Sequence, residues 1–179
     1  PEVVMKKFIL MLSTALLSVI LCSCSGGGLF ADPTPAPIPQ VDPTQVISLQ
    51  DAMDAIGNAY TLVQESETAQ REGNKATIAY RADPTGAGDP VIVTVKQMTD
   101  TVSADAVWNE YDLERIKRSS AEILEGIGDD AYIAFPTIHV YSKGCEIAIT
   151  AGSGSDDGQK DLLERLARKA VENLSVIMP

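Results

Sequence analysis

Hydrophobic and polar residues alternate along several short segments of the chain, and this period of two predicts β-strands. The clearest case covers residues 91–96, where Val91, Val93 and Val95 share one face. Further strands are predicted over residues 60–68, 75–82, 131–135, 138–141 and 145–150. Gly with Asn, or Gly with Lys, stands between neighbouring strands, so the first two and the last two of these are expected to form hairpins.

Three other segments carry apolar residues at helical spacing. Ser48, with Asp51 three residues later, predicts the capped start of a helix that Gly57 ends. A second helix is predicted to run from Ser103 to about residue 119, and a third over about residues 159–174, with Leu and Ala on one stripe. The expected order is therefore helix, strands, helix, strands, helix.

This order predicts the α+β class: an antiparallel sheet with about three helices packed on it, arranged as two similar helix-plus-strands halves. A doubly wound fold is disfavoured, because the strands come in hairpin clusters and do not alternate singly with helices. A two-residue turn at Lys143-Gly144 places Val140 opposite Ile147 and sends His139 to the other side of the sheet.

The N-terminal end has the parts of a secretory signal. Lys6 and Lys7 precede a hydrophobic segment over residues 8–21, and small residues follow. A transmembrane helix is the alternative, but at about 1.5 Å per residue this segment spans about 21 Å, short of a hydrocarbon core of roughly 30 Å. Export from the cytoplasm is therefore expected.

The run Leu21-Cys22-Ser23-Cys24 resembles the lipobox of bacterial lipoproteins, whose cysteine receives a diacylglycerol before the signal is removed. The resemblance implies lipidation at Cys24, because the small Ser23 precedes it whereas the bulky Leu21 precedes Cys22. It also implies an extracytoplasmic protein that its N-terminal lipid anchors to the cell membrane. The two acyl chains of a diacylglycerol suffice for stable anchoring.

These features divide the chain into four parts. Residues 1–4 are expected to be an artefactual extension before Met5, residues 5–23 a lipoprotein signal peptide, residues 24–44 a Gly- and Pro-rich tether, and residues 45–179 a single globular domain. Proline-rich chain prefers extended polyproline II, so the tether is interpreted as a spacer. A docking site for a proline-recognising partner is the alternative.

The net charge of the chain limits the classes of partner that it is expected to bind. The chain carries a formal net charge of −11, and nucleic acids and anionic lipids are bound through clustered Lys and Arg. Nucleic-acid binding is therefore not expected, and contact with the membrane is expected only through the lipid on Cys24. Once Cys22 is removed and Cys24 is acylated, Cys145 is the one cysteine left, so no intrachain disulfide is expected.

His139, the one histidine, and Cys145 are the candidates for reactive chemistry. His139 could be a metal ligand or a general base, but no second His or Cys stands at ligand spacing, so an ordinary polar strand residue is favoured. The hairpin register places Cys145 on the inward face, where it is expected to be buried. Because the two lie on opposite faces, a Cys–His nucleophile pair is not expected.

Acidic residues gather in three loops. They are Asp129-Asp130, Asp156-Asp157, and the pair Asp83 and Asp89 around a Gly-rich loop. Caps and turns explain aspartates at loop ends, and none of these loops has the ligand spacing of an EF-hand. A weak surface calcium site in one of them is the alternative.

The run Gly126-Ile127-Gly128-Asp129-Asp130-Ala131 is similar to a Gly-x-Gly-Asp-x-Ala element of small secreted bacterial lipoproteins of unknown function, some of them related to extracellular sensor domains. Its glycines permit positive φ at a tight entry to the sheet, and its Asp can accept from free amides. The similarity implies a structural turn and transfers no active site.

No catalytic set, cofactor site or metal site is predicted in the domain. The sequence therefore predicts a non-enzymatic, lipid-anchored binding or accessory module of the cell envelope, with sensing as one form of that role and an envelope protein or small ligand as partner. The alternative is an envelope hydrolase or metal-dependent enzyme that uses His139 and surface carboxylates. Trp108, Tyr111 and Tyr132 are expected in the core, with a ligand groove as the alternative.

Overall fold

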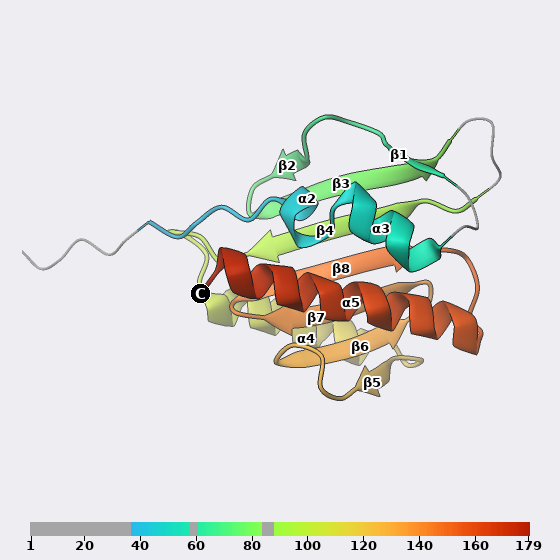
Figure 1. The fold of residues 1–179 in the computed structure, drawn as a ribbon. Coiled ribbons are helices and arrows are strands. Elements are labelled where there is room, and N and C mark those ends of the chain that lie inside the picture. Colours follow the sequence, from blue (N-terminus) through green and yellow to red (C-terminus); the bar gives the residue numbers. More distant parts are fainter. Residues whose placement is uncertain (1–36, 58–60, 84–87) are drawn as a thin grey trace, which may run out of the picture. The chain divides into compact units, whose positions relative to one another are not determined.

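The computed structural model describes residues 37–57, 61–83 and 88–179. Within them lie four helices, α2 (Pro43–Val46), α3 (Leu49–Ile56), α4 (Ala104–Lys117) and α5 (Asp157–Ile177). The strands are β1 (Leu62–Gln64), β2 (Gln70–Glu72), β3 (Lys75–Ala82), β4 (Val91–Gln97), β5 (Glu122–Leu124), β6 (Asp130–Ala134), β7 (Thr137–Ser142) and β8 (Cys145–Ala151). The predicted α+β class is confirmed (Figure 1).

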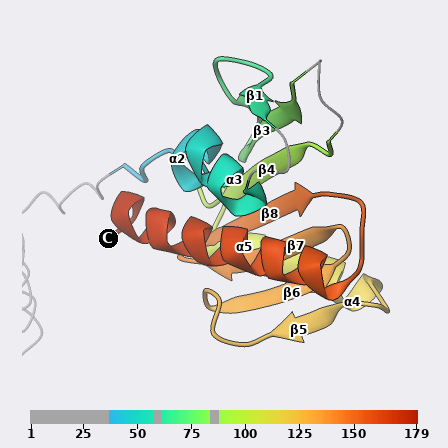
Figure 2. The ribbon, with the colours of Figure 1, turned by 45° about the vertical axis from the view of Figure 1, so that its right-hand side comes forward.

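All eight strands form one antiparallel sheet. Its order is β1-β3-β4-β8-β7-β6-β5, and β2 pairs with β3 beside β1. Helices α2, α3 and α5 lie on one face of the sheet, and α4 lies on the other (Figures 1 and 2). The main core is between α5 and the sheet, where alternate strand residues such as Val93, Ile147 and Ile149 are buried against Leu163 and Leu166.

Helices α3 and α4 begin where their caps were predicted, whereas α2, with Asp42 as its N-cap, starts inside the predicted tether and was not predicted. Ser48 and Asp51 form a complete capping box, with the Asp51 amide donating to Ser48 Oγ at 3.1 Å and the Ser48 amide donating to the Asp51 carboxylate at 3.0 Å. Gly57 ends α3 at a φ of 66°. Ser103 caps α4, and Asp156 caps the long α5 by accepting from the Gln159 amide. These side chains satisfy backbone N–H groups that a helix start leaves without partners.

The predicted strand over residues 60–68 is wrong in extent. Only Leu62–Gln64 forms a strand there, because the Gln64 side chain donates to the Ser66 carbonyl and Ser66 Oγ donates to the Thr68 carbonyl, which bends the chain. The chain then re-enters the sheet as β2 (Gln70–Glu72) and turns through the predicted Gly73-Asn74. Residue 60 lies outside the described residues.

The folded domain begins earlier than residue 45, the boundary predicted from the prolines. Val41 is fully buried, and its amide donates to the buried Gln97 side chain at 2.7 Å. Gln97 Nε2 in turn donates to the Pro39 carbonyl at 3.0 Å, so a β4 side chain fastens this segment to the sheet. The proline content alone therefore did not predict where the packed chain starts, because the hydrogen bonds that hold this segment come from Gln97, which is distant in the sequence.

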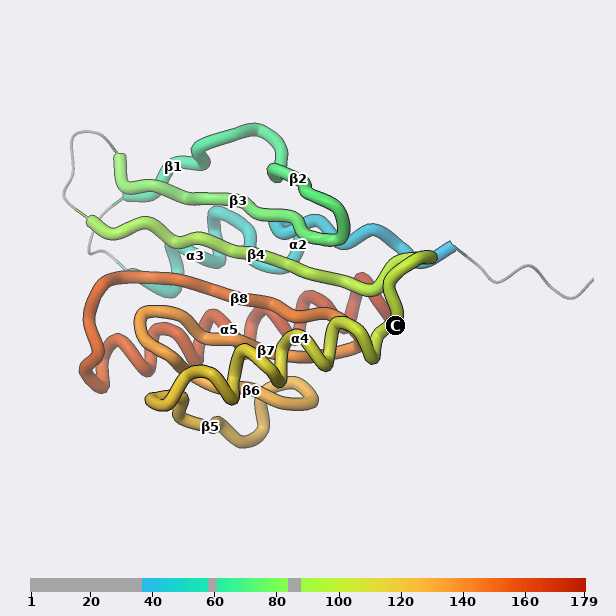
Figure 3. Tube along the Cα trace, turned by 180° about the vertical axis from the view of Figure 1, so that it is seen from behind, coloured from blue at the N-terminus to red at the C-terminus, as the bar shows by residue number. Residues whose placement is uncertain are grey.

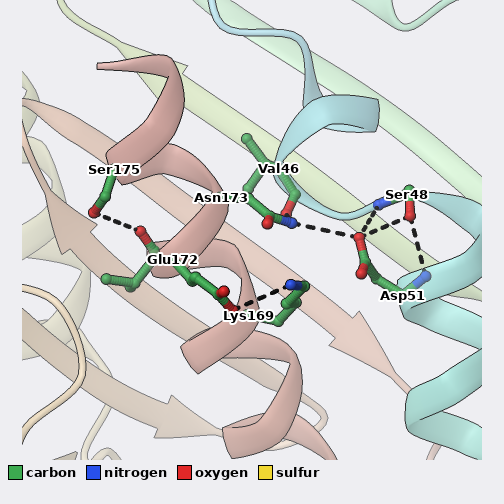
Figure 4. A network of polar contacts seen from close by, with 8 residues as sticks. Val46, Ser48, Asp51, Lys169, Glu172, Asn173 and Ser175 are labelled. Atoms are coloured by element: carbon green, nitrogen blue, oxygen red, sulfur yellow. Dashed lines mark hydrogen bonds and ion pairs between the residues drawn. The ribbon is translucent and has the colours of Figure 1, made fainter. Parts of the chain in front are cut away.

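Helix α5 fastens the same N-terminal segment from the other side. Asn173 donates to the Val46 carbonyl at 3.0 Å and lies 3.4 Å from the Asp51 carboxylate (Figure 4). On β3, Tyr80 Oη donates to the carbonyl of the fully buried Ile47 at 2.5 Å. The segment before α3 is thus part of the core and is bonded to β3, β4 and α5.

The β7–β8 hairpin has the predicted register. Val140 pairs with Ile147 and Ile138 pairs with Ile149, across a two-residue turn in which Lys143 and Gly144 both have positive φ. His139 consequently faces the α4 side of the sheet, and Cys145 faces the α5 side.

Candidate functional site

The two faces of the sheet are covered unequally. Three helices lie over the α5 side, whereas α4 lies over β6, β7 and β8, reaches β4 through the Glu110–Lys96 ion pair, and leaves β3 without a described helix above it (Figure 3). Between α4 and the sheet the buried residues Tyr111, Tyr132 and Ala134 form an aromatic-rich contact, with Trp108 and Tyr141 at its edge. We call the uncovered part of this side the open face.

The strand register defines which side chains share the open face, because directly paired residues of antiparallel strands point to the same side. One row across the sheet is Gln70, Thr77, Thr94, Ala148, His139 and Tyr132. The next row is Glu72, Lys75, Lys96, Glu146 and Tyr141. Small or polar side chains thus form the open part of each row, and the aromatic residues of the rows lie under α4.

Two hollows on the open face meet at these rows. One, of about 160 Å³, lies between the β1–β2 segment and the floor residues Thr77, Ala79 and Ile92. The other, of about 200 Å³, is lined by Lys75, Thr94, Lys96, His139, Glu146 and Ala148. A third hollow, of about 440 Å³ at the β2 edge of the sheet, shares Thr77 with the first and Lys75 with the second, so the three adjoin along β3 and β4, and we call this row of hollows the groove.

A charged network closes the groove at the α4 end. His139 Nδ1 lies 3.1 Å from Glu146 Oε1, and Lys96 Nζ lies 3.5 Å from Glu146 Oε2 and 2.7 Å from Glu110 Oε1. Burial alone would raise the pKa of Glu146, but the hydrogen bond from His139 and the charge of Lys96 outweigh it and lower the pKa. Burial would lower the pKa of Lys96, and Glu110 and Glu146 raise it instead.

His139 is buried, with 7% of its surface exposed. Its ring stacks on that of Tyr132 at a centroid distance of 4.6 Å. Nδ1 is used by Glu146, and within the described part of the chain neither His139 Nε2 nor Tyr132 Oη has a hydrogen-bond partner. His139 therefore supports the wall of the groove and does not present Nε2 to solvent.

Cys145 lies on the opposite side of the sheet, fully buried and 3.7 Å from Met178 Sδ. Burial raises the pKa of its thiol to about 11, so at neutral pH it is a thiol and not a thiolate. The predicted separation of His139 and Cys145 on two faces is confirmed, and the two do not form a pair.

The loop aspartates are bonded to protein donors. Asp129 accepts from the Lys143 amide at 3.0 Å, Asp130 accepts from Tyr111 Oη at 2.7 Å, and Asp156 accepts from the Gln159 amide at 2.9 Å. Ser153 Oγ donates to Asp89 at 3.1 Å. No group of three His, Cys, Asp or Glu side chains is placed to hold a metal ion in the ranges that the structure describes. Part of the Gly-rich loop, residues 84–87, is outside those ranges.

A separate hollow of about 250 Å³ lies on the covered side, between α3 and α5, and is lined by Asp51, Asp54, Ala55, Arg165, Leu166 and Lys169. Arg165 joins α5 to α3 by donating to the Ala55 carbonyl at 2.9 Å, and Lys169 pairs with Glu172 within α5 at 3.1 Å (Figure 4). Asp51 is also taken by the capping box, and Asp54 accepts from the Gln50 side chain.

Sequence reasoning missed the role of Lys96, Glu110 and Glu146. The predicted hairpin register already placed Glu146 on the same face as His139, so a charge inside a strand of alternating apolar residues was a usable signal. The contact between Glu110 and Lys96 could not be predicted, because it depends on where α4 lies on the sheet. Of the three aromatics expected in the core, Tyr111 and Tyr132 are buried and Trp108 is half-buried at the edge of α4.

Comparison with known proteins finds no family model, no curated protein and no solved structure that matches this chain. Cys24, the predicted lipidation site, lies outside the described residues. Among the residues inside them, no helix is long and apolar enough to cross a membrane.

The contacts of Glu146 predict how the stability of the domain changes at low pH. Glu146 has a lowered pKa in the folded state, so its stabilising contribution is present above the ordinary value of 4.5 and is lost as pH falls through the lower folded-state value. Glu146→Gln is expected to cost about 1–3 kcal/mol at neutral pH and to weaken the loss of stability on acidification. Urea unfolding at several pH values measures both effects.

The control is Glu172→Gln on α5, an exposed ion-pair partner of Lys169. It is expected to leave the free energy of unfolding and its pH dependence nearly unchanged. An equal effect of both variants would mean that Glu146 contributes no more than a surface carboxylate.

Proposed function

We propose that this protein is a lipid-anchored, extracytoplasmic binding module of the bacterial cell envelope that binds its ligand on the open face. The observation that carries the proposal is the unequal covering of the sheet: the α5 side is closed by three helices, and the α4 side keeps a groove over β3 and β4. The role is one of binding and not of catalysis.

The groove suits binding because its floor is rigid and small. Thr77, Thr94 and Ala148 sit on paired central strands, so the backbone that positions them is bonded on both sides. The floor residues are neither fully buried nor fully exposed, and small side chains let a ligand approach the sheet closely. Concave sites with a few convergent polar groups are the usual form of small-ligand sites.

The location part of the proposal rests on the Leu21-Cys22-Ser23-Cys24 run and on the residues before it. Because Pro39 and Val41 are already fastened to the sheet, the free spacer runs from Cys24 to about residue 38. As polyproline II at about 3.1 Å per residue, it would hold the domain up to roughly 45 Å from the bilayer.

The hydrogen bond between His139 and Glu146 is the one observation that favours the second candidate, an envelope hydrolase or metal-dependent enzyme. A general base needs a ring nitrogen within reach of substrate. His139 Nδ1 is already bonded to Glu146, and Nε2 is buried, so this candidate would require α4 to move before His139 could act.

Occupancy of the groove in the cell tests the binding proposal. In a Thr94→Cys variant, the new thiol is expected to react with a membrane-impermeant maleimide in the purified protein and to be protected on intact cells, where the ligand is present. The native Cys145 is buried and gives little background. A Glu172→Cys variant on the exposed surface of α5 should react in both settings.

A further inference from the structure

We propose that the groove binds the oxyanion group of a small molecule, a carboxylate or a phosphate, between Lys75 and Lys96. This inference rests on the proposed function and adds a class of ligand to it. The two lysines stand directly opposite each other on β3 and β4, and both line the same hollow with Thr94.

A like-charge pair in directly opposed strand positions is destabilising unless something neutralises it. Lys96 is neutralised by Glu110 at 2.7 Å and Glu146 at 3.5 Å. Lys75 is exposed, and within the described part of the chain it takes part in no ion pair within 4.0 Å, although Glu72 stands opposite it on β2. Lys75 therefore presents an ammonium group without an ion pair to any described residue at the mouth of the hollow, beside a Lys96 that Glu110 and Glu146 already neutralise, and an anion there could pair with it.

The hydroxyls beside the lysines add donors. Thr77 Oγ1 and Thr94 Oγ1 are 3.1 Å apart, and either can donate to the other. Because each hydroxyl carries one hydrogen and accepts as well, this bond uses only one of the two hydrogens. The other remains available for a ligand oxygen close to the ammonium groups.

The size of the hollow limits the group that binds between the lysines. Its volume of about 200 Å³ is smaller than the roughly 300–1,000 Å³ of sites for drug-sized molecules, which indicates that this group has few heavy atoms, whereas a larger ligand would extend into the adjoining hollow. The chain as a whole has a net charge of −11 and repels anions at long range. Affinity for an anion must therefore come from the local groups, and this makes it sensitive to single substitutions.

The test titrates full-length lipidated protein in detergent micelles with succinate, with inorganic phosphate and with the neutral succinamide, at constant ionic strength. Amide NMR shifts of Thr94, Lys96 and Ala148 report on the groove. Saturable shifts with succinate identify a carboxylate ligand, and saturable shifts with phosphate identify a phosphate ligand. Succinamide is expected to give none, and saturation by all three or by neither anion would overturn the inference.

Lys75→Gln is expected to weaken binding of the active anion about tenfold, and Lys75→Arg to restore it, since one charge-assisted contact carries that much affinity. The matched control is Lys117→Gln, which removes an exposed lysine at the end of α4. If Lys75→Gln and Lys117→Gln weakened anion binding equally, the affinity would depend only on the net charge of the protein, and the proposed site at Lys75 would be wrong. If Thr94→Cys is protected in cells while no anion binds, the ligand class is wrong and the binding function stands.

Discussion

Gly128→Ala is expected to destabilise the domain by about 2–5 kcal/mol. Gly128 has a φ of 62°, and a Cβ there would lie 2.7 Å from the Tyr141 carbonyl oxygen and 2.8 Å from Val140 Cγ1. The left-handed conformation costs an L-residue about 1–2 kcal/mol, and overpacking against a rigid strand costs about 1–3 kcal/mol more. Chemical denaturation of wild type and variant measures the difference.

Gly126→Ala is the matched control, because Gly126 has a similar φ of 73° but a Cβ there meets no atom within 4 Å. This variant is expected to lose only about 1–2 kcal/mol of stability, which is the cost of the left-handed backbone conformation for an L-residue. If both variants lost the same free energy, the close approach of the loop to β7 would not exist in solution. The pair therefore separates backbone strain from packing in the Gly-x-Gly-Asp turn.

Cys24→Ala is expected to move most of the protein from the membrane fraction to the medium. A diacylglycerol on Cys24 would supply the two acyl chains that stable anchoring requires, and the acidic domain offers no basic patch to replace them. Fractionation of cells followed by immunoblotting measures the distribution.

Cys22→Ala is the control, since the bulky Leu21 precedes Cys22 and the small Ser23 precedes Cys24. This variant should remain in the membrane fraction. Release of both variants, or retention of both, would contradict the assignment of Cys24 as the lipidated residue and would leave the domain without its proposed location.

Local signals predicted much of the fold. Caps at Ser48 and Ser103 placed two helix starts, because a side chain that satisfies free amides acts within one turn of helix. The turn at Lys143-Gly144 fixed the register of β7 and β8, and with it the opposite faces of His139 and Cys145.

Distant contacts explain what the sequence did not predict. Gln97 bonds the Val41 amide across 56 residues, so the start of the domain depends on a partner that local proline content does not report. The strand β5 (Glu122–Leu124) has only three residues and was not predicted, because alternation over so short a segment cannot be recognised. Its pairing with β6 defines it.

The candidate site, too, could be predicted from the sequence only in part. The parity of β7 and β8 places His139 and Glu146 on one face, but whether that face is covered depends on the path of α4. Helix α4 carries exposed Leu113 and Ile116 as well as buried Val107 and Tyr111, so its apolar residues do not mark one buried stripe. The open face could therefore be found only in three dimensions.

The central claim is that the open face, and not the helix-covered face, is the binding surface. The most direct measurement is a maleimide protection profile on intact cells and on purified protein, with single cysteines at Thr77, Thr94 and Ala148 on the groove and at Gln50 and Glu172 on the helices. The account predicts protection in cells at the three groove positions alone. Equal reactivity of all five positions in cells and in the purified protein would contradict it.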